Sequence, residues 1–152
     1  MASSMPHWPK RRCSALKSAD ADLAAIAGKS LKEVRYHLRH SRDWLVRLGD
    51  GTDESHARAQ TALDHLLPYT QEFWAGSPAE SAAIAAGIGV DPNALKSDWD
   101  AIVDAALAEA TLQRPAPGGY VPEGKEGIHS EHLGYLLAEM QSLARAHPNG
   151  VW

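Results

Sequence analysis

The chain has 152 residues, of which 44% are hydrophobic and 22% charged, so it is long enough for one domain and is not a disordered protein. Ala and Leu number 42 while Ile, Val and Thr number 15, which favours helices and excludes an all-β fold. The net charge of −4 argues against a nucleic-acid partner, and no apolar run approaches the roughly 20 residues of a membrane helix.

Residues 1–18 carry four basic side chains and no acidic one, and we expect them to form a disordered basic tail. This segment lacks the apolar core of a secretory signal. Cys13 is the single cysteine of the chain and has no partner for an internal disulfide, which fits a reducing compartment. We therefore expect a cytoplasmic protein.

Residues 19–48 are predicted to form one long helix, about 43 Å in length, because apolar residues recur there at helical spacing. The expected buried stripe consists of Ala27, Leu31, Val34, Leu38, Leu45 and Leu48. The basic residues Lys32, Arg35, Arg39 and Arg42 are expected on the opposite, solvated side. The Gly49-Asp50-Gly51 sequence is expected to end the helix.

Shorter helices are predicted after this turn. One covers residues 54–74, with a break at Pro68, and a short helix capped by Ser77 follows. Another runs from Asp91-Pro92 to about residue 112, and a last helix starts after Ser130. Because these helices are too short to cover the first one, part of its surface is expected to bind a partner.

Residues 113–129 separate the last two helices and contain three prolines and four glycines, which predict an irregular connection. The connection is longer than an ordinary link between helices, so it is either disordered or docked on another surface.

Glu33, His37 and His40 form the one group with a metal-like pattern. Together with Trp44 they fall within about 60° of arc on one helical face, where they are expected to be half-buried. One carboxylate and two imidazoles are suitable metal ligands. However, helical di-iron sites use Glu-x-x-His, and Tyr36 stands at the position of that histidine. The preferred interpretation is that the histidines pack at a helix–helix boundary.

A second polar cluster, His129, Glu131 and His132, precedes the last helix. It lacks the His-Glu-x-x-His spacing of a zinc protease. Glu131 has an ordinary role in the first turn of a helix, where a negative charge is favourable. With Lys125 just ahead of it, the cluster is either a docking surface or a local cap.

Several motifs together resemble the C subunit of bacterial ring-1,2-phenylacetyl-CoA epoxidases. They are the segments 22–45, 47–53, 109–112, 127–134 and 137–141, in consistent order and spacing from about residue 19 to the end of the chain. The resemblance implies a ferritin-like helical bundle and a non-catalytic, structural subunit. It also implies a partner A subunit whose di-iron centre epoxidises the ring, alongside the other subunits of the complex, in aerobic phenylacetate catabolism. No cofactor is then expected in this chain.

The resemblance also places particular residues. Glu33, Tyr36, His37 and His40 fall on a core bundle helix, and residues 127–141 on a characteristic C-terminal segment. The expected subunit-interface residues are Tyr36, Trp44, Lys125, His129, Glu131, His132 and Glu139.

Members of that family have earlier bundle helices before the position of residue 19. Residues 1–18 resemble no part of them, so residues 19–152 are expected to be the C-terminal part of an incomplete, truncated bundle. Two alternatives remain at this point. One is a small ferritin-like iron-binding enzyme that uses Glu33, His37 and His40, and the other is a non-functional remnant.

Overall fold

The computed structural model describes residues 17–118, 121 and 123–151, and most of the predicted basic tail lies outside them. This part of the chain is all-α, as predicted, and contains no strand beyond an isolated bridge between Glu123 and Ile128. The elements are α1 (Ala21–Gly49), α2 (Asp53–Leu66), η3 (Leu67–Trp74), α3 (Pro78–Ala85), α4 (Asn93–Glu109), η4 (Gly124–Glu126) and α5 (His132–Ala146), where η marks a 3₁₀-helix.

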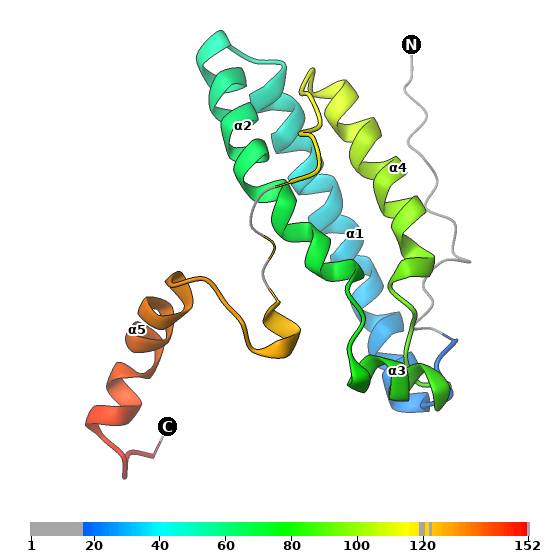
Figure 1. Cartoon of the computed structure of the whole chain (residues 1–152), viewed down its shortest axis with the longest axis vertical. Coiled ribbons are helices and arrows are strands. Elements are labelled where there is room, and N and C mark those ends of the chain that lie inside the picture. The colour runs from blue at the N-terminus through cyan, green and yellow to red at the C-terminus, as the bar shows by residue number, and fades with distance from the viewer. Residues whose placement is uncertain (1–16, 119–120, 122, 152) are drawn as a thin grey trace.

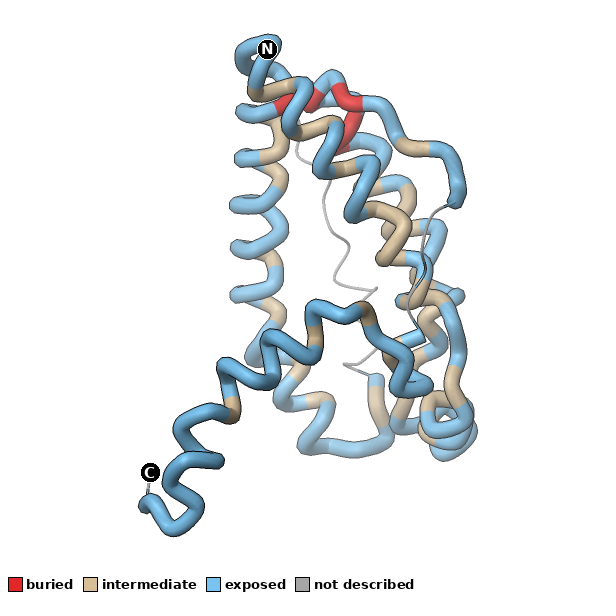
Figure 2. Tube along the Cα trace, turned by 60° about the vertical axis from the view of Figure 1, so that its left-hand side comes forward, coloured by how far each residue is buried: buried red, intermediate tan, exposed pale blue. Residues whose placement is uncertain are grey.

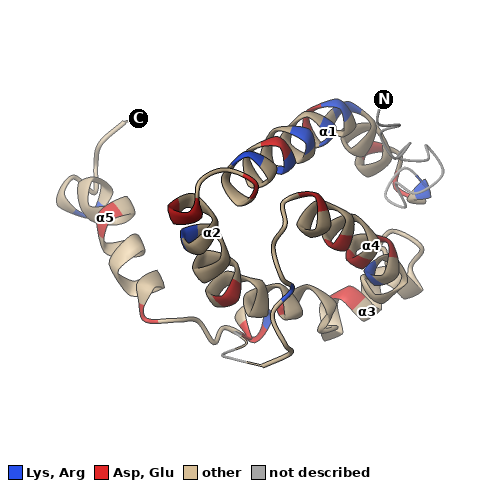
Figure 3. Cartoon of the chain, turned by 90° about the horizontal axis from the view of Figure 1, so that it is seen from above, with Lys and Arg blue, Asp and Glu red and all other residues tan. Residues whose placement is uncertain are grey.

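The long helix α1 packs against both α2 and α4 (Figure 1). η3 continues the direction of α2, and α3 lies near the N-terminal end of α1 (Figure 1). α5 stands apart from these helices in the views of Figure 1 and Figure 3. The described part of the chain therefore consists of a layer of packed helices and a separate C-terminal helix.

Local sequence signals set most helix ends. The Asp20 carboxylate accepts hydrogen bonds from the backbone N–H groups of Asp22 and Leu23 at 2.9 and 3.0 Å, which caps α1. The predicted break at Pro68 is confirmed, because α2 ends at Leu66 and the chain continues as a 3₁₀-helix. Proline has no N–H to donate, so it cannot continue the α-helical ladder.

The predicted start of α3 is also confirmed. Ser77 and Glu80 form a reciprocal capping box, in which each side chain accepts from the backbone N–H of the other residue. At α4 the Asp91 carboxylate accepts from the N–H of Asn93 at 2.9 Å. This helix ends at Glu109, three residues earlier than predicted, because Thr111 adopts a left-handed conformation with φ of 59°.

The start of α5 differs from the prediction. Ser130 contributes its backbone carbonyl, which accepts from the N–H of Leu133 at 3.1 Å, and α5 has no side-chain cap. The helix begins at His132, two residues after the expected cap. The first turn of α5 therefore lacks the side-chain acceptor that fixes α3.

The buried core is small and lies at one end of the helical layer, shown in red in Figure 2. Its centre is Leu107, Ala110 and Leu112, and partly buried residues of α1, α2 and α4 pack around it: Leu45, Val46, Ala59, Leu63 and Val103. The C-terminal end of α1 fits closely there, because a Cβ atom on Gly49 would lie 2.2 Å from the carbonyl oxygen of Ala110. This contact fixes α1 against the end of α4.

The predicted buried stripe of α1 is only partly correct. Ala27, Leu31 and Leu45 are half-buried, whereas Val34, Leu38 and Leu48 are exposed. Two arginines that were expected on the solvated side, Arg35 and Arg42, are half-buried. The covered side of α1 is thus rotated away from the expected stripe, because α2 and α4 contact one side of the helix and Glu109 of α4 forms an ion pair with Arg42.

Candidate subunit interface

The rotation leaves an apolar surface on α1 uncovered. We call it the outer face of α1, and it consists of Leu23, Ile26, Val34, Trp44 and Leu48, all of which are exposed. At 100° per residue these positions lie within about 80° of arc, so they form one stripe along most of the helix. Val34, near its middle, is 56% exposed. In the described part of the chain, nothing covers this stripe as a packed helix would.

Aromatic rings border the outer face of α1 and stack along the helix at intervals of four residues. The rings of Tyr36 and His40 lie with their centroids 6.0 Å apart and nearly parallel, and His40 meets Trp44 edge-on at 6.4 Å. The guanidinium groups of Arg39 and Arg47 lie 5.7 and 5.5 Å from the Tyr36 and Trp44 ring centroids. We call these five residues the aromatic ladder. Aromatic residues and arginine are the types enriched in protein–protein interfaces.

The three residues with the metal-like pattern, Glu33, His37 and His40, all lie on α1. Among the described residues, no group of three His, Cys, Asp or Glu side chains converges to hold a metal ion. The rings of His37 and His40 contact Tyr36 instead. The expectation that this group is half-buried at a helix–helix boundary is wrong, because Glu33, His37, His40 and Trp44 are all exposed on the side of α1 that α2 and α4 leave free.

Lys125 acts within the chain. Its ammonium donates to the Ala75 carbonyl at 2.6 Å and to the Glu80 carboxylate at 2.9 Å, and its backbone N–H donates to Glu72 at 3.2 Å. The hydrogen bond from Lys125 lowers the pKa of Glu80. These contacts dock the start of η4 on η3 and α3, so the irregular connection is docked at this point.

α5 presents the second uncovered apolar surface. Its stripe consists of Leu133, Leu136, Leu137, Met140 and Leu143, and within it only Leu133 is half-buried. Met140, near the centre, is 71% exposed. A helix of about 15 residues is marginal in water without tertiary packing. The α5 stripe therefore has the properties of a surface that is covered in an assembly.

The other predicted interface residues lie around α5. Glu131 directly precedes the helix, His132 is its first residue, and Glu139 lies within it; all three are exposed. His129 lies against Gly124, since its Cε1 atom is 3.1 Å from the position of a Cβ on that glycine. The structure thus separates the predicted interface residues into one group on α1 and another around α5, with Lys125 anchoring the connection.

Charge distinguishes α1 from the remainder of the chain. The helix carries six basic and three acidic residues, a net charge of +3, whereas the whole chain has −4 (Figure 3). Two of the six basic residues, Arg35 and Arg42, lie on the covered side of α1, and Arg42 pairs with Glu109.

Sequence reasoning missed part of the outer face of α1 and a contact outside the interface. Leu23 and Ile26 continue the 3–4 spacing of the outer face toward the start of α1, and this pattern was available in the sequence. Trp74 and Trp99 meet edge-on with centroids 5.3 Å apart, although they come from η3 and α4. No local pattern predicts that second contact, because it depends on how the helices pack.

Comparison with known proteins gives two matches. A family described as phenylacetic acid catabolic protein matches residues 7–152. The chain is also 47% identical over 137 residues to the C subunit of the 1,2-phenylacetyl-CoA epoxidase of Escherichia coli (strain K12). That alignment covers 90% of this chain and 55% of the relative, so the chain spans little more than half of the relative's length. No described helix is both long and apolar enough to span a membrane.

Proposed function

The chain belongs to the phenylacetic acid catabolic protein family, and from this premise we propose that it is a structural subunit of a phenylacetyl-CoA epoxidase complex. Its role is to bind and support the catalytic subunit, which carries the di-iron centre, in the aerobic breakdown of phenylacetate in the cytoplasm. The family has a ferritin-like helical fold, to which the all-α structure conforms. The 47% identity to a C subunit supports the assignment to the non-catalytic subunit.

The observation that carries this proposal is the pair of uncovered apolar surfaces, the outer face of α1 and the α5 stripe. Exposed leucines, methionine and tryptophan in continuous stripes mark interaction sites in soluble proteins. The outer face of α1 is bordered by the aromatic ladder, which adds arginine and aromatic groups to an apolar centre. Both surfaces are helical, so a helical partner can pack along them.

The side chains of α1 do not fit a metal centre of this chain's own. Glu33, His37 and His40 all come from one helix, and no group of three or more His, Cys, Asp or Glu among the described residues is arranged to hold a metal ion. Helical di-iron sites draw ligands from several helices, because each iron needs carboxylates on more than one side. We propose that the partner carries the chemistry and that this chain supplies binding surfaces.

Co-expression with the catalytic subunit tests the proposal, with the complex detected by affinity capture and gel filtration. The full chain is expected to co-purify in stoichiometric amount. Val34→Asp on α1 and Met140→Asp on α5 are expected to weaken capture, because each places a carboxylate in a packed apolar interface.

Leu66→Asp is the matched control. Leu66 is 60% exposed at the end of α2, outside both surfaces, and its replacement is expected to leave capture unchanged. A wild-type chain that remains monomeric beside the catalytic subunit would contradict the proposal. So would equal capture of Val34→Asp, Met140→Asp and the control.

A further inference from the structure

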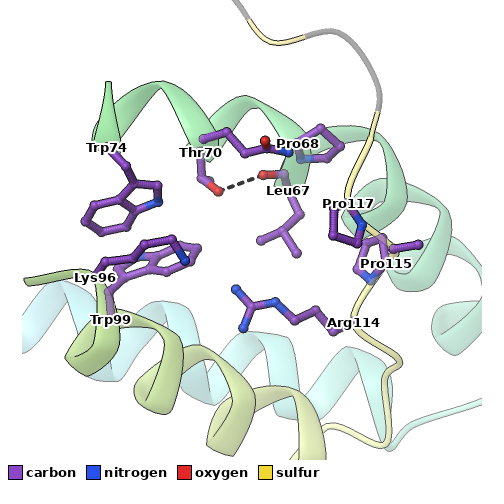
Figure 4. Close-up of a pocket in the computed structure, with 11 residues that line it drawn as sticks. Leu67, Pro68, Thr70, Trp74, Lys96, Trp99, Arg114, Pro115 and Pro117 are labelled. Atoms are coloured by element: carbon purple, nitrogen blue, oxygen red, sulfur yellow. Dashed lines mark hydrogen bonds between the residues drawn. The ribbon is translucent and has the colours of Figure 1, made fainter. Parts of the chain in front are cut away.

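A pocket of about 290 Å³ lies away from both proposed binding surfaces. It is formed by η3, the first half of α4 and the segment that follows α4 (Figure 4). Trp74 lines it from η3, Trp99 from α4, and Arg114 and Pro117 from the segment after α4. Three separate parts of the chain therefore meet around one space.

The walls of the pocket are mainly apolar. The indoles of Trp74 and Trp99 are half-buried and meet at 63°, so they form two sides of a corner. Figure 4 shows the two indoles at one end of the pocket, Pro115 and Pro117 at the other, and Leu67 between them. Flat rings and rigid proline side chains are suited to the faces of a planar, apolar ligand.

Two cations complete the lining. The Lys96 ammonium lies 5.7 Å from the centroid of the Trp74 ring, and the Arg114 guanidinium lies 5.6 Å from that of Trp99. Arg114 donates to Asp100 and Asp104, each at 2.6 Å, through its two terminal nitrogens. A guanidinium has further N–H donors beyond these two.

Both cations are paired with acids and partly exposed, the Lys96 side chain to 47% and the Arg114 side chain to 33%. Hydrogen bonds from Lys96 and then Arg114 lower the pKa of Asp100, so this carboxylate stays charged and fixes both cations beside the indoles. The Asp104 side chain is 57% exposed, and water screens its charge. Asp100 therefore orients Arg114, whereas its second carboxylate partner, Asp104, is solvated.

We propose that this pocket binds a small aromatic carboxylate, with the ring between the indoles and Leu67 and with the carboxylate accepting hydrogen bonds from Arg114. The volume suits such a ligand, since a cavity of about 150 Å³ holds a benzene ring. The apolar walls favour the ring, and a charged hydrogen bond to the guanidinium favours the anion. This proposal rests on the pocket alone and does not depend on the role of the chain as a subunit.

A matched set of probes separates the two halves of the proposed ligand: 3-phenylpropionate has the ring and the carboxylate, 3-phenylpropan-1-ol only the ring, and propionate only the carboxylate. Binding is followed in the full chain by the NMR signals of the indole N–H groups. The Trp74 and Trp99 signals are expected to shift and saturate with 3-phenylpropionate, whereas the Trp44 signal stays in place. The alcohol and propionate are each expected to bind at least about tenfold more weakly.

Variants test the role of the guanidinium. Arg114→Gln is expected to weaken binding of 3-phenylpropionate by about tenfold while leaving binding of the alcohol unchanged. Arg58→Gln is the control, since this side chain is 81% exposed on α2 and outside the pocket. Lys96→Gln provides a second test if Arg114→Gln fails to fold. It is also expected to weaken binding of 3-phenylpropionate. Equal binding of the alcohol and the carboxylate, or no saturable shift of Trp74 and Trp99, overturns the proposal.

Discussion

The close contact at the end of α1 leads to a clear prediction for Gly49→Ala. A Cβ atom added there would lie 2.2 Å from the carbonyl oxygen of Ala110 and 2.9 Å from its Cβ atom, both too close for real atoms. The backbone has little freedom to move away. The Gly49 carbonyl oxygen lies 2.7 Å from Nδ1 of His56, and it accepts a hydrogen bond from Thr111 at 3.1 Å.

Two opposing effects decide the size of the change. Replacing glycine with alanine in a helix contributes up to about 1 kcal/mol of helix propensity. Overpacking a buried site costs about 1–3 kcal/mol, and Gly49 is at the upper end because the obstacle is backbone. We therefore expect a net loss of about 1–2 kcal/mol in the free energy of unfolding. For a chain of this size this corresponds to a fall in melting temperature of about 2–8 °C.

The assay is thermal unfolding of the full chain followed by circular dichroism at the helical band. Gly134→Ala in α5 is the matched control, because nothing beyond its chain neighbours and the adjacent helix backbone lies within 4 Å of the position of its Cβ. This control is expected to keep or raise the helical signal through propensity alone. A Gly49→Ala protein that melts at or above the wild-type temperature would refute the packing of α1 against the end of α4.

Three further predictions concern single side chains. Lys125→Met is expected to raise the pKa of Glu80 toward its ordinary value in an NMR titration, and an unchanged pKa would contradict the ion pair. Because that pKa is lowered in the folded protein, the pair stabilises the fold at neutral pH, and this contribution is lost as the pH falls through the lowered pKa. Ser77→Ala is expected to cost about 1 kcal/mol in urea unfolding through loss of the α3 cap, and an unaltered midpoint would count against it. Metal analysis of the purified chain is expected to find less than stoichiometric iron, with no difference in the His37→Ala and His40→Ala variants. Stoichiometric iron that these variants lose would instead support the iron-binding enzyme.

Local signals in the sequence were sufficient to predict where most of the helices lie, although not the end of α4 or the cap of α5. The apolar spacing predicted α1 to within two residues at its start, and Pro68 and Ser77 marked helix boundaries correctly. These features depend on hydrogen bonds between residues a few positions apart, so the sequence around each end contains the necessary information.

The sequence did not show which side of α1 is covered. That depends on contacts between distant segments, such as the ion pair between Arg42 and Glu109, which are 67 residues apart. The apolar pattern of α1 spans more of its circumference than α2 and α4 cover. Periodicity alone therefore predicted a stripe that lies between the covered side and the exposed outer face of α1. The same limit applies to the pocket, where Trp74, Trp99 and Arg114 meet through tertiary packing.

The assignment of particular interface residues remains a prediction. Tyr36 and Trp44 lie in the aromatic ladder, and Glu131, His132 and Glu139 lie around α5, all of them exposed. Exposure allows contact with a partner, but it does not identify the partner. The family match and the similarity to the Escherichia coli epoxidase protein supply that part of the proposal.

The central claim is that the outer face of α1 and the α5 stripe are both covered by another subunit. Amide hydrogen exchange tests it most directly, by comparing the chain alone with the chain bound to the catalytic subunit. We predict slower exchange on binding throughout 132–146, because α5 lacks packing in the free chain and its amides open easily. Slower exchange is also predicted in 23–48 of α1. A stable complex in which neither segment changes its exchange rate would contradict the account.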